Sequence, residues 1–411
     1  MTENPDLYPL YLASAENLPS VSLAGKPVPR VNGHIHTPHS FSAFTSMEQP
    51  FTMARQEEVA VLGINDFYTT GGYPEFAALA LDHHVFPLFN IEFMALQPDE
   101  QRRGIRVNDP VNPGRTYLSG KGLKFPVNLS ERNSKKLATL QKESNRQTYS
   151  MVEMLNDYLV QIGSDLRFEA AEMQRKLARN LLRERHIAMA VRIAIAEKYH
   201  TEEERRDCLK KIFNGKEPKS SFNQIAALEN EIRNNLLKSG GPAYVPEDEK
   251  AFLTLAEVNS LIRDAGGIPC YPVLLDDAKG NFTDFEEDWG KMADRLAELG
   301  IYMIELIPGR NDFRIVKDFV RYFHSRGFVV SFGTEHNTPQ LDRLTVTCRG
   351  GIALDEELLQ INFRGAAIIA AHQYQGANGR PGFPGDHFPG TGELDLLEQL
   401  GTKLICAFTQ P

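Results

Sequence analysis

A regular alternation of short apolar segments with segments of helical periodicity constrains the fold of this chain more than any other feature. In the first part of the chain, strands are predicted over 31–36, 62–67 and 84–93. Helices are predicted between them, over 50–61 and 74–84. The same alternation returns near residue 254 and continues to a long helix predicted over 355–374. Strands that alternate with helices in this way are typical of parallel βα units. Six or seven such units favour a barrel-like α/β fold over an open sheet.

Two segments interrupt the alternation. Residues 94–126 are dense in Gly, Pro and Asn, which suits a loop or a hairpin. Residues 127–240 consist of charged stretches that carry apolar residues at helical spacing, which indicates a helical insertion. We expect a break in the helical pattern near His186. We therefore divide the chain into an N-terminal arm (1–28), the first part of the barrel (29–126), the helical insertion (127–240), and the second part of the barrel with a C-terminal tail (241–411).

Composition narrows the class of protein. Of the 411 residues 42% are apolar, which is ordinary for a globular protein with a sizeable core. The net charge of −9 makes nucleic acid and membrane surfaces unlikely partners, since proteins that bind them usually carry excess Lys and Arg. Four scattered cysteines without a C-x-x-C pair indicate free thiols in a reducing compartment. With no signal peptide and no apolar run of ~20 residues, we expect a cytoplasmic protein that spans no membrane.

Residues that can carry chemistry gather at the ends of the predicted strands. His34 and His36 lie in the stretch HIHTPHSF and share one face, because side chains alternate along a strand. The other predicted strand ends hold Asp66, Glu92, Tyr271, Glu305, Glu335 and His336. In βα barrels the reactive side chains lie at this end of the strands. Two interpretations remain open at this point: ligands of a divalent metal ion, or strand-end residues that bond to the backbone.

Several ordered motifs resemble the PHP (polymerase and histidinol phosphatase) superfamily of metal-dependent phosphoesterases. GHIHTPHSFS looks like its first motif, GINDFYTTGGYPEF like its second, FNIEF like its third and FGTEHNTP like its last. GGPAYVP, AEVNSLIRDAGGIPCYPVL and RERHIAMAV are similar to the subgroup of nucleoside 3′,5′-bisphosphate phosphatases. The resemblance implies a distorted (β/α)7 barrel with a helical insertion, and a metal-dependent phosphoesterase that acts on a small phosphorylated substrate.

The resemblance also implies which metal ligands remain. The ligands of the family's first metal correspond to His34, His36, Glu92 and Glu335. Positions that hold ligands of the other two metals carry residues unsuited to that role, namely Phe41, Phe67, Tyr117, Tyr271 and Asn337. One site keeps all its ligands while the other two lose their own. We therefore predict a single divalent metal ion, Zn, Mn or Fe, as the cofactor.

Further residues receive predicted roles around that metal. His39 and His336 are candidates for the general acid or base, and Asp66 for orienting a ligand histidine. Predicted substrate-binding residues are Arg115 and Lys121 in the loop NPGRTYLSGKG, Arg310 in IPGRND, and Tyr271. Two alternatives remain open: a mononuclear hydrolase or lyase that acts on a non-phosphate substrate, and a catalytically silent binding protein. The G-x-x-x-x-G-K-[ST] and G-x-G-x-x-G patterns of nucleotide-binding loops are absent.

Overall fold

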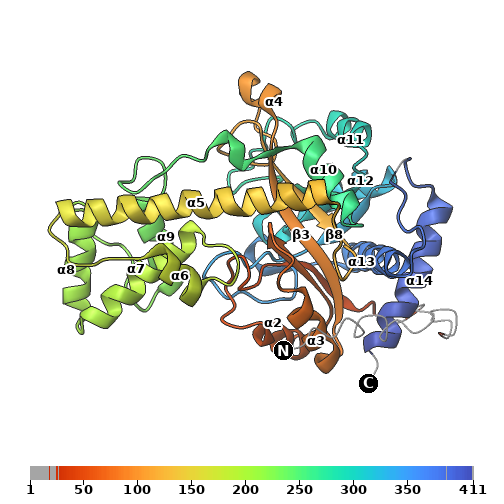
Figure 1. Ribbon diagram of the computed structural model, residues 1–411. Helices are drawn as coiled ribbons and strands as arrows, with labels where there is room; N and C mark the ends of the chain where they lie inside the picture. Colours follow the sequence, from red (N-terminus) through yellow and green to blue (C-terminus); the bar gives the residue numbers. More distant parts are fainter. Residues whose placement is uncertain (1–17, 19–24, 26, 386, 410–411) are drawn as a thin grey trace.

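The central sheet forms a nearly closed barrel (Figure 1). The computed structural model describes residues 18, 25, 27–385 and 387–409, and most of the predicted N-terminal arm lies outside them. The strands of the sheet are β1 (Arg30–Ile35), β2 (Val59–Phe67), β3 (Phe86–Leu96), β4 (Arg115–Lys121), β5 (Leu253–Thr254), β6 (Ile268–Val273), β7 (Met303–Leu306) and β8 (Val329–Phe332). They pair in the order β1-β2-β3-β4-β6-β7-β8, and the short β5 pairs with β3.

The edge strands β1 and β8 approach each other at their C-terminal ends. Ile35 and Glu335 form a parallel bridge. The amide of His36 donates to the carbonyl of Glu335 at 2.8 Å, and the amide of Glu335 donates to that of His34 at 2.9 Å. Only glycine fits at Gly333, because a Cβ there would lie 2.3 Å from the Cβ of His34. The predicted α/β barrel is confirmed, with a small gap between its two edges.

One strand distorts the barrel. β4 runs antiparallel to both of its neighbours, β3 and β6, whereas the other pairs along the barrel are parallel. The segment 94–126 therefore contains a hairpin, which also carries the short helix α4 (Pro98–Arg103) at its turn. Because β4 is reversed, its last residue Lys121 pairs with the first residue of β6 and lies deep in the barrel. The predicted loop position of Lys121 is wrong for this reason.

Helices cover the outside of the barrel. They are α2 (Glu48–Gln56), α3 (Tyr73–His83), α10 (Leu255–Asp264), α11 (Trp289–Glu298), α12 (Phe313–Ser325), α13 (Glu356–Ala377) and α14 (Thr391–Thr409). The apolar helix α13 lies between the sheet and α14, and Gly365 allows it to approach the carbonyl of Val330 in β8. Beyond residue 376 the sequence predicts a C-terminal tail without a helix, so α14 is an addition to the predicted fold.

Five helices between β4 and β5 form a separate body. They are α5 (Glu131–Gln161), α6 (Ala170–Leu177), α7 (Glu184–Lys198), α8 (Glu202–Ile212) and α9 (Ile225–Leu236). In Figure 1 the long α5 runs from the barrel to α8 at the left edge of the molecule, with α6, α7 and α9 beside it. Their apolar side chains form a hydrophobic core that is distinct from the core of the barrel. The helical structure is interrupted between α6 and α7, and His186 lies in the first turn of α7.

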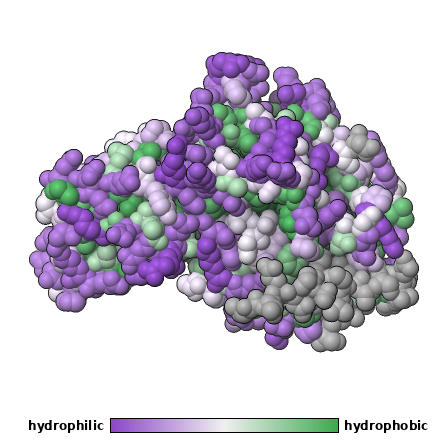
Figure 2. Space-filling model, in the orientation of Figure 1, coloured by the Kyte–Doolittle hydropathy of each residue, from purple (hydrophilic) through white to green (hydrophobic). Residues whose placement is uncertain are grey.

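The surface is polar over most of its visible extent. Figure 2 shows hydrophilic residues across the barrel and the insertion, with hydrophobic residues in small groups between them. Among the residues that the structure describes, no helix is long and apolar enough to cross a membrane.

Candidate metal centre

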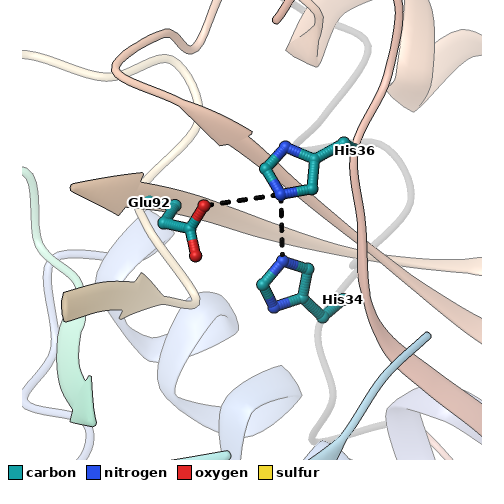
Figure 3. A group of neighbouring side chains, drawn as sticks. All are labelled: His34, His36 and Glu92. Atoms are coloured by element: carbon teal, nitrogen blue, oxygen red, sulfur yellow. Dashed lines mark hydrogen bonds and ion pairs between the residues drawn. The ribbon is translucent and has the colours of Figure 1, made fainter. Parts of the chain in front are cut away.

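Three potential metal ligands, two at the end of β1 and one within β3, converge at one place (Figure 3). The Nε2 atoms of His34 and His36 lie 3.3 Å apart, and His36 Nε2 lies 3.4 Å from Glu92 Oε2. All three residues are buried, and their ligand atoms lie within 4.8 Å of one another. In the described part of the chain this is the only such group of three or more His, Cys, Asp and Glu residues. Two imidazoles and a carboxylate suit a single borderline divalent ion.

His34 is oriented by a buried ion pair beneath it. Its Nδ1 lies 2.9 Å from Glu305 Oε2, and the same oxygen accepts from Lys121 Nζ at 2.5 Å. Burial alone would raise the pKa of Glu305, but the charges of Lys121 and His34 hold it well below its usual range. The ionised Glu305 makes Nδ1 of His34 the protonated nitrogen. Nε2 of His34 then carries the lone pair, as in the carboxylate–histidine pairs of metal sites, and the side-chain amide nitrogen of Asn65 lies 3.0 Å from it.

His36 is oriented through a serine. Its Nδ1 lies 3.2 Å from Ser40 Oγ, and Ser40 donates its hydroxyl hydrogen to Asp66 Oδ1 at 2.7 Å. Asp66 also accepts from the amide of Thr37 at 2.7 Å, so its position is fixed by the backbone. Because the serine hydroxyl is already donating, Nδ1 of His36 is the donor in their contact. In the neutral ring, Nε2 of His36 is therefore unprotonated and faces Glu92, whereas in a protonated ring Nε2 donates to that carboxylate.

The electrostatics of the group favour a cation. Burial raises the pKa of Glu92, but the hydrogen bond and charge of His36, together with the charge of His34, outweigh it and lower the pKa. Burial is also the main reason that the pKa of His34 lies below its usual value. An ionised carboxylate and neutral imidazoles are the protonation states that metal ligands require.

Glu335, the predicted fourth ligand, lies apart from this group. Its carboxylate forms an ion pair with Arg310, and its backbone holds the end of β1. Arg310 also lies within electrostatic reach of Glu92. The structure thus brings Arg310 and Glu335 to the edge of the centre as a pair.

The two candidates for general acid or base have other partners. His39 Nδ1 lies 2.6 Å from Asn180 Oδ1, in the loop between α6 and α7. His336 Nδ1 lies 2.8 Å from Thr334 Oγ1, its Nε2 lies 3.0 Å from the carbonyl of Asp342, and its ring stacks on Phe44. Neither histidine joins the metal-ligand group.

The remaining predicted substrate-binding residues are scattered. Lys121 is completely buried under His34, and the hydroxyl of Tyr271 donates to Glu286 at 2.9 Å. Burial, together with the charge of Glu286, raises the pKa of Tyr271 well above its usual value. Arg115 forms an ion pair with Glu247 at 2.5 Å and lines a cavity next to the metal-ligand group.

That cavity lies between the mouth of the barrel and the helical insertion. It has a volume of about 460 Å³, and His36 and Glu92 form part of its wall. Phe41 and Phe67 line it from the barrel, at positions where the resemblance places metal ligands. Arginines from the start of α7 and side chains from α5 and α9 line it from the insertion. The metal-ligand group therefore borders a cavity that the insertion covers.

Some residues of the centre escaped sequence analysis. Ser40, which orients His36, lies in the stretch GHIHTPHSFS but received no predicted role. Arg183 and Arg185, which line the cavity, occur in the stretch RERHIAMAV, whose resemblance to a family motif assigns them no role. The tertiary structure determines which face of the insertion meets the barrel. Local residue spacing therefore could not identify Arg183 and Arg185.

Comparison with known proteins places the fold. No protein-family model and no curated protein matches the chain. Among solved structures, one named "putative metal-dependent phosphoesterase" from Bifidobacterium adolescentis has a TM-score of 0.52 at 17% identity, with 82% of this chain and 96% of that chain covered. An amidohydrolase from Chromobacterium violaceum has a TM-score of 0.49 at 17% identity, with 81% and 96% covered. The chain therefore shares its fold, over most of its length, with the Bifidobacterium protein.

Proposed function

We propose that the protein is a metal-dependent hydrolase that uses one divalent ion to act on a small phosphorylated substrate. The observation that carries this proposal is the shared orientation of His34 and His36. Each histidine has a partner on Nδ1, the two Nε2 atoms face each other, and that of His36 also faces Glu92. Ligands held in this way before the metal arrives are typical of functional metal sites. The Bifidobacterium protein that shares this fold, named a "putative metal-dependent phosphoesterase", supports the same class of reaction.

His34, His36 and Glu92 would hold the ion. Catalytic sites commonly use three protein ligands and leave a position open. A bound divalent ion polarises a phosphoryl oxygen and lowers the pKa of bound water toward ~7. The predicted fourth ligand, Glu335, already has a partner in Arg310, so the proposal rests on the other three residues.

Other residues of the centre hold the two ligand histidines in place, and the insertion encloses the cavity. Lys121 and Glu305 hold His34, while Asp66 and Ser40 hold His36. The insertion covers the cavity and limits the size of the substrate. The contacts of His39 and His336 lend no support to a proton-transfer role, and we leave that role out of the proposal.

Metal reconstitution followed by a substrate screen tests the proposal. The purified protein is stripped with a chelator, reloaded with Zn, Mn or Fe(II), and assayed on phosphate mono- and diesters and on non-phosphate esters and amides. We expect about one equivalent of metal and hydrolysis of a phosphate ester, both lost in His36→Ala. The matched control is His83→Ala, which removes a histidine that pairs with Glu48 at 2.6 Å elsewhere on the barrel.

Each other outcome points to a different function. Hydrolysis confined to non-phosphate substrates would replace the phosphoesterase by a mononuclear hydrolase of another class. Failure to bind metal after reconstitution would leave a binding protein on a barrel scaffold.

A further inference from the structure

Two arginines in the cavity have no carboxylate partner. Arg183 caps the start of α7, Arg185 lies in its first turn, and both line the cavity together with His36 and Glu92. Arg183 donates to Ser144 Oγ at 3.0 Å, and Arg185 donates to Asn230 Oδ1 at 3.2 Å. Both acceptors are neutral. Among the described residues neither guanidinium forms an ion pair, although Glu184 and Glu229 lie within electrostatic reach of Arg185.

The other cations of the cavity have carboxylate partners. Arg115 pairs with Glu247 at 2.5 Å. Arg233 and Lys238 both pair with Glu184, at 2.5 Å and 2.8 Å. Glu184 lies between the two arginines in sequence, but its carboxylate is occupied by these partners. The insertion's wall therefore carries excess positive charge, and Arg183 and Arg185 are its two cations that form no ion pair among the described residues.

Two phenyl rings of the barrel hold these arginines. The guanidinium carbon of Arg183 lies 4.5 Å from the centre of the Phe67 ring, and that of Arg185 lies 5.6 Å from the centre of the Phe41 ring. A guanidinium over a ring face is attracted by the negative face of the ring, and its N–H groups stay free at the edges for other partners. The rings thus fix the position of both cations without neutralising them.

The arginines and the metal-ligand group share one electrostatic environment. Tyr117, which lines the cavity, lies within reach of the charges of both Glu92 and Arg183. Burial, and then the neighbouring Arg233, lower the pKa of Arg185 to about 10. Cations crowded in this way are stabilised when an anion enters between them. Planar guanidinium groups bind phosphate with two parallel hydrogen bonds, which makes phosphate a well-matched anion.

We propose that Arg183 and Arg185 bind the phosphoryl group of the substrate beside the metal ion and stabilise the charge that develops on it. This inference rests on the proposed function for the identity of the substrate. Phosphoryl transfer depends mainly on positioning and on stabilisation of charge, which several metal ions supply in multinuclear sites. In this protein two guanidinium groups from the insertion would supply that charge, held on rings that stand where further metal ligands are expected.

Phosphate binding to the full-length protein tests the inference separately from hydrolysis. Calorimetry with inorganic phosphate is carried out on the chelator-treated and on the metal-loaded protein, with metal content measured for every variant. In the double variant Arg183→Gln/Arg185→Gln we expect phosphate affinity to fall by roughly 100-fold or more, because two charge-assisted contacts are lost. Metal content should not change, since neither arginine contacts the ligands.

The insertion offers a matched control. Arg205 lies over the ring of Phe222 at 5.3 Å, outside the cavity, so Arg205→Gln removes a similar cation–ring contact from the same body. This control should bind phosphate as the unmodified protein does. Phe67→Leu keeps both charges but removes one platform, and we expect a loss of roughly tenfold in affinity.

The outcomes separate the two proposals. Unchanged phosphate affinity in the Gln double variant, or no phosphate binding by the unmodified protein in either state, would overturn the inference. Arginine-dependent phosphate binding without any phosphate-ester hydrolysis would support the anion site and refute the proposed function. Where the Gln variant fails to fold, Arg183→Lys/Arg185→Lys replaces it. It should bind phosphate more weakly because an ammonium group cannot bind in the bidentate mode, and unchanged affinity would again refute the inference.

Discussion

Replacing Lys121 by Met should expose how strongly the metal centre depends on the ion pair beneath it. The side chains of Lys121 and Glu305 are 0% and 1% exposed. Glu305 Oε1 has no hydrogen-bond partner, so Lys121 and His34 are the groups that compensate its charge. Removal of one partner from a buried ion pair typically costs about 3–5 kcal/mol, since the other charge is left unpaired. We expect Lys121→Met to lower the free energy of unfolding by that amount.

A double-mutant cycle separates the ion pair from other effects of the substitution. Glu305→Gln removes the opposite charge and is also expected to destabilise the protein, because it leaves the buried ammonium group unpaired. The double variant Lys121→Met/Glu305→Gln should lose less than the sum of the single changes, by about 2 kcal/mol or more. Urea unfolding followed by circular dichroism at pH 7, with chelator present, gives all four free energies. A loss below about 1 kcal/mol in Lys121→Met, or additive single effects, would refute the account of a coupled buried pair.

Three further predictions concern the insertion, the fold and the metal site. Burial, with a smaller effect of the charge of Arg183, lowers the pKa of His186 to about 3. Its contribution to stability is therefore complete above its ordinary pKa of 6.5 and declines as the pH falls from 6.5 toward 3. Unfolding free energies should drop by about 2 kcal/mol between pH 6.5 and 5 from this group, and His186→Asn should remove that part of the slope. In Gly365→Ala the new Cβ would lie 2.0 Å from the carbonyl of Val330, so thermal unfolding should show a loss of about 3 kcal/mol, and an unchanged midpoint would contradict the close packing of α13 on β8. Glu335→Gln should retain its metal in elemental analysis, whereas metal loss would make Glu335 the fourth ligand.

The barrel was predictable because its signal is local. Each βα unit carries its own alternation of apolar residues, and neighbouring units in sequence become neighbours in the sheet. The helix α14 was missed although Leu394, Leu397 and Leu404 recur at helical spacing. It follows a Gly- and Pro-rich segment and contains Gly401, whose missing Cβ allows the carbonyl of Ala367 to approach. A residue that weakens an isolated helix is here required for packing.

The metal-ligand group follows from the position of strand ends, but its surroundings do not. His34 and His36 lie at the carboxyl end of β1, and the parallel register sets Glu92 of β3 opposite Phe67, the last residue of β2, so the three meet at one end of the barrel. The direction of Lys121 depends on the reversal of β4, which the composition of residues 94–126 allowed but did not specify. The partners of Arg183 and Arg185 depend on how the insertion folds back over the barrel, and such long-range contacts leave no periodic trace in the sequence.

An anomalous-diffraction map of the metal-loaded protein tests the central claim most directly. The account predicts one anomalous peak, within about 2.0–2.2 Å of the Nε2 atoms of His34 and His36 and an oxygen of Glu92. Additional peaks beside Phe41 or Phe67 would contradict a single-metal centre, and a map without a peak at the three ligands would contradict the metal site itself.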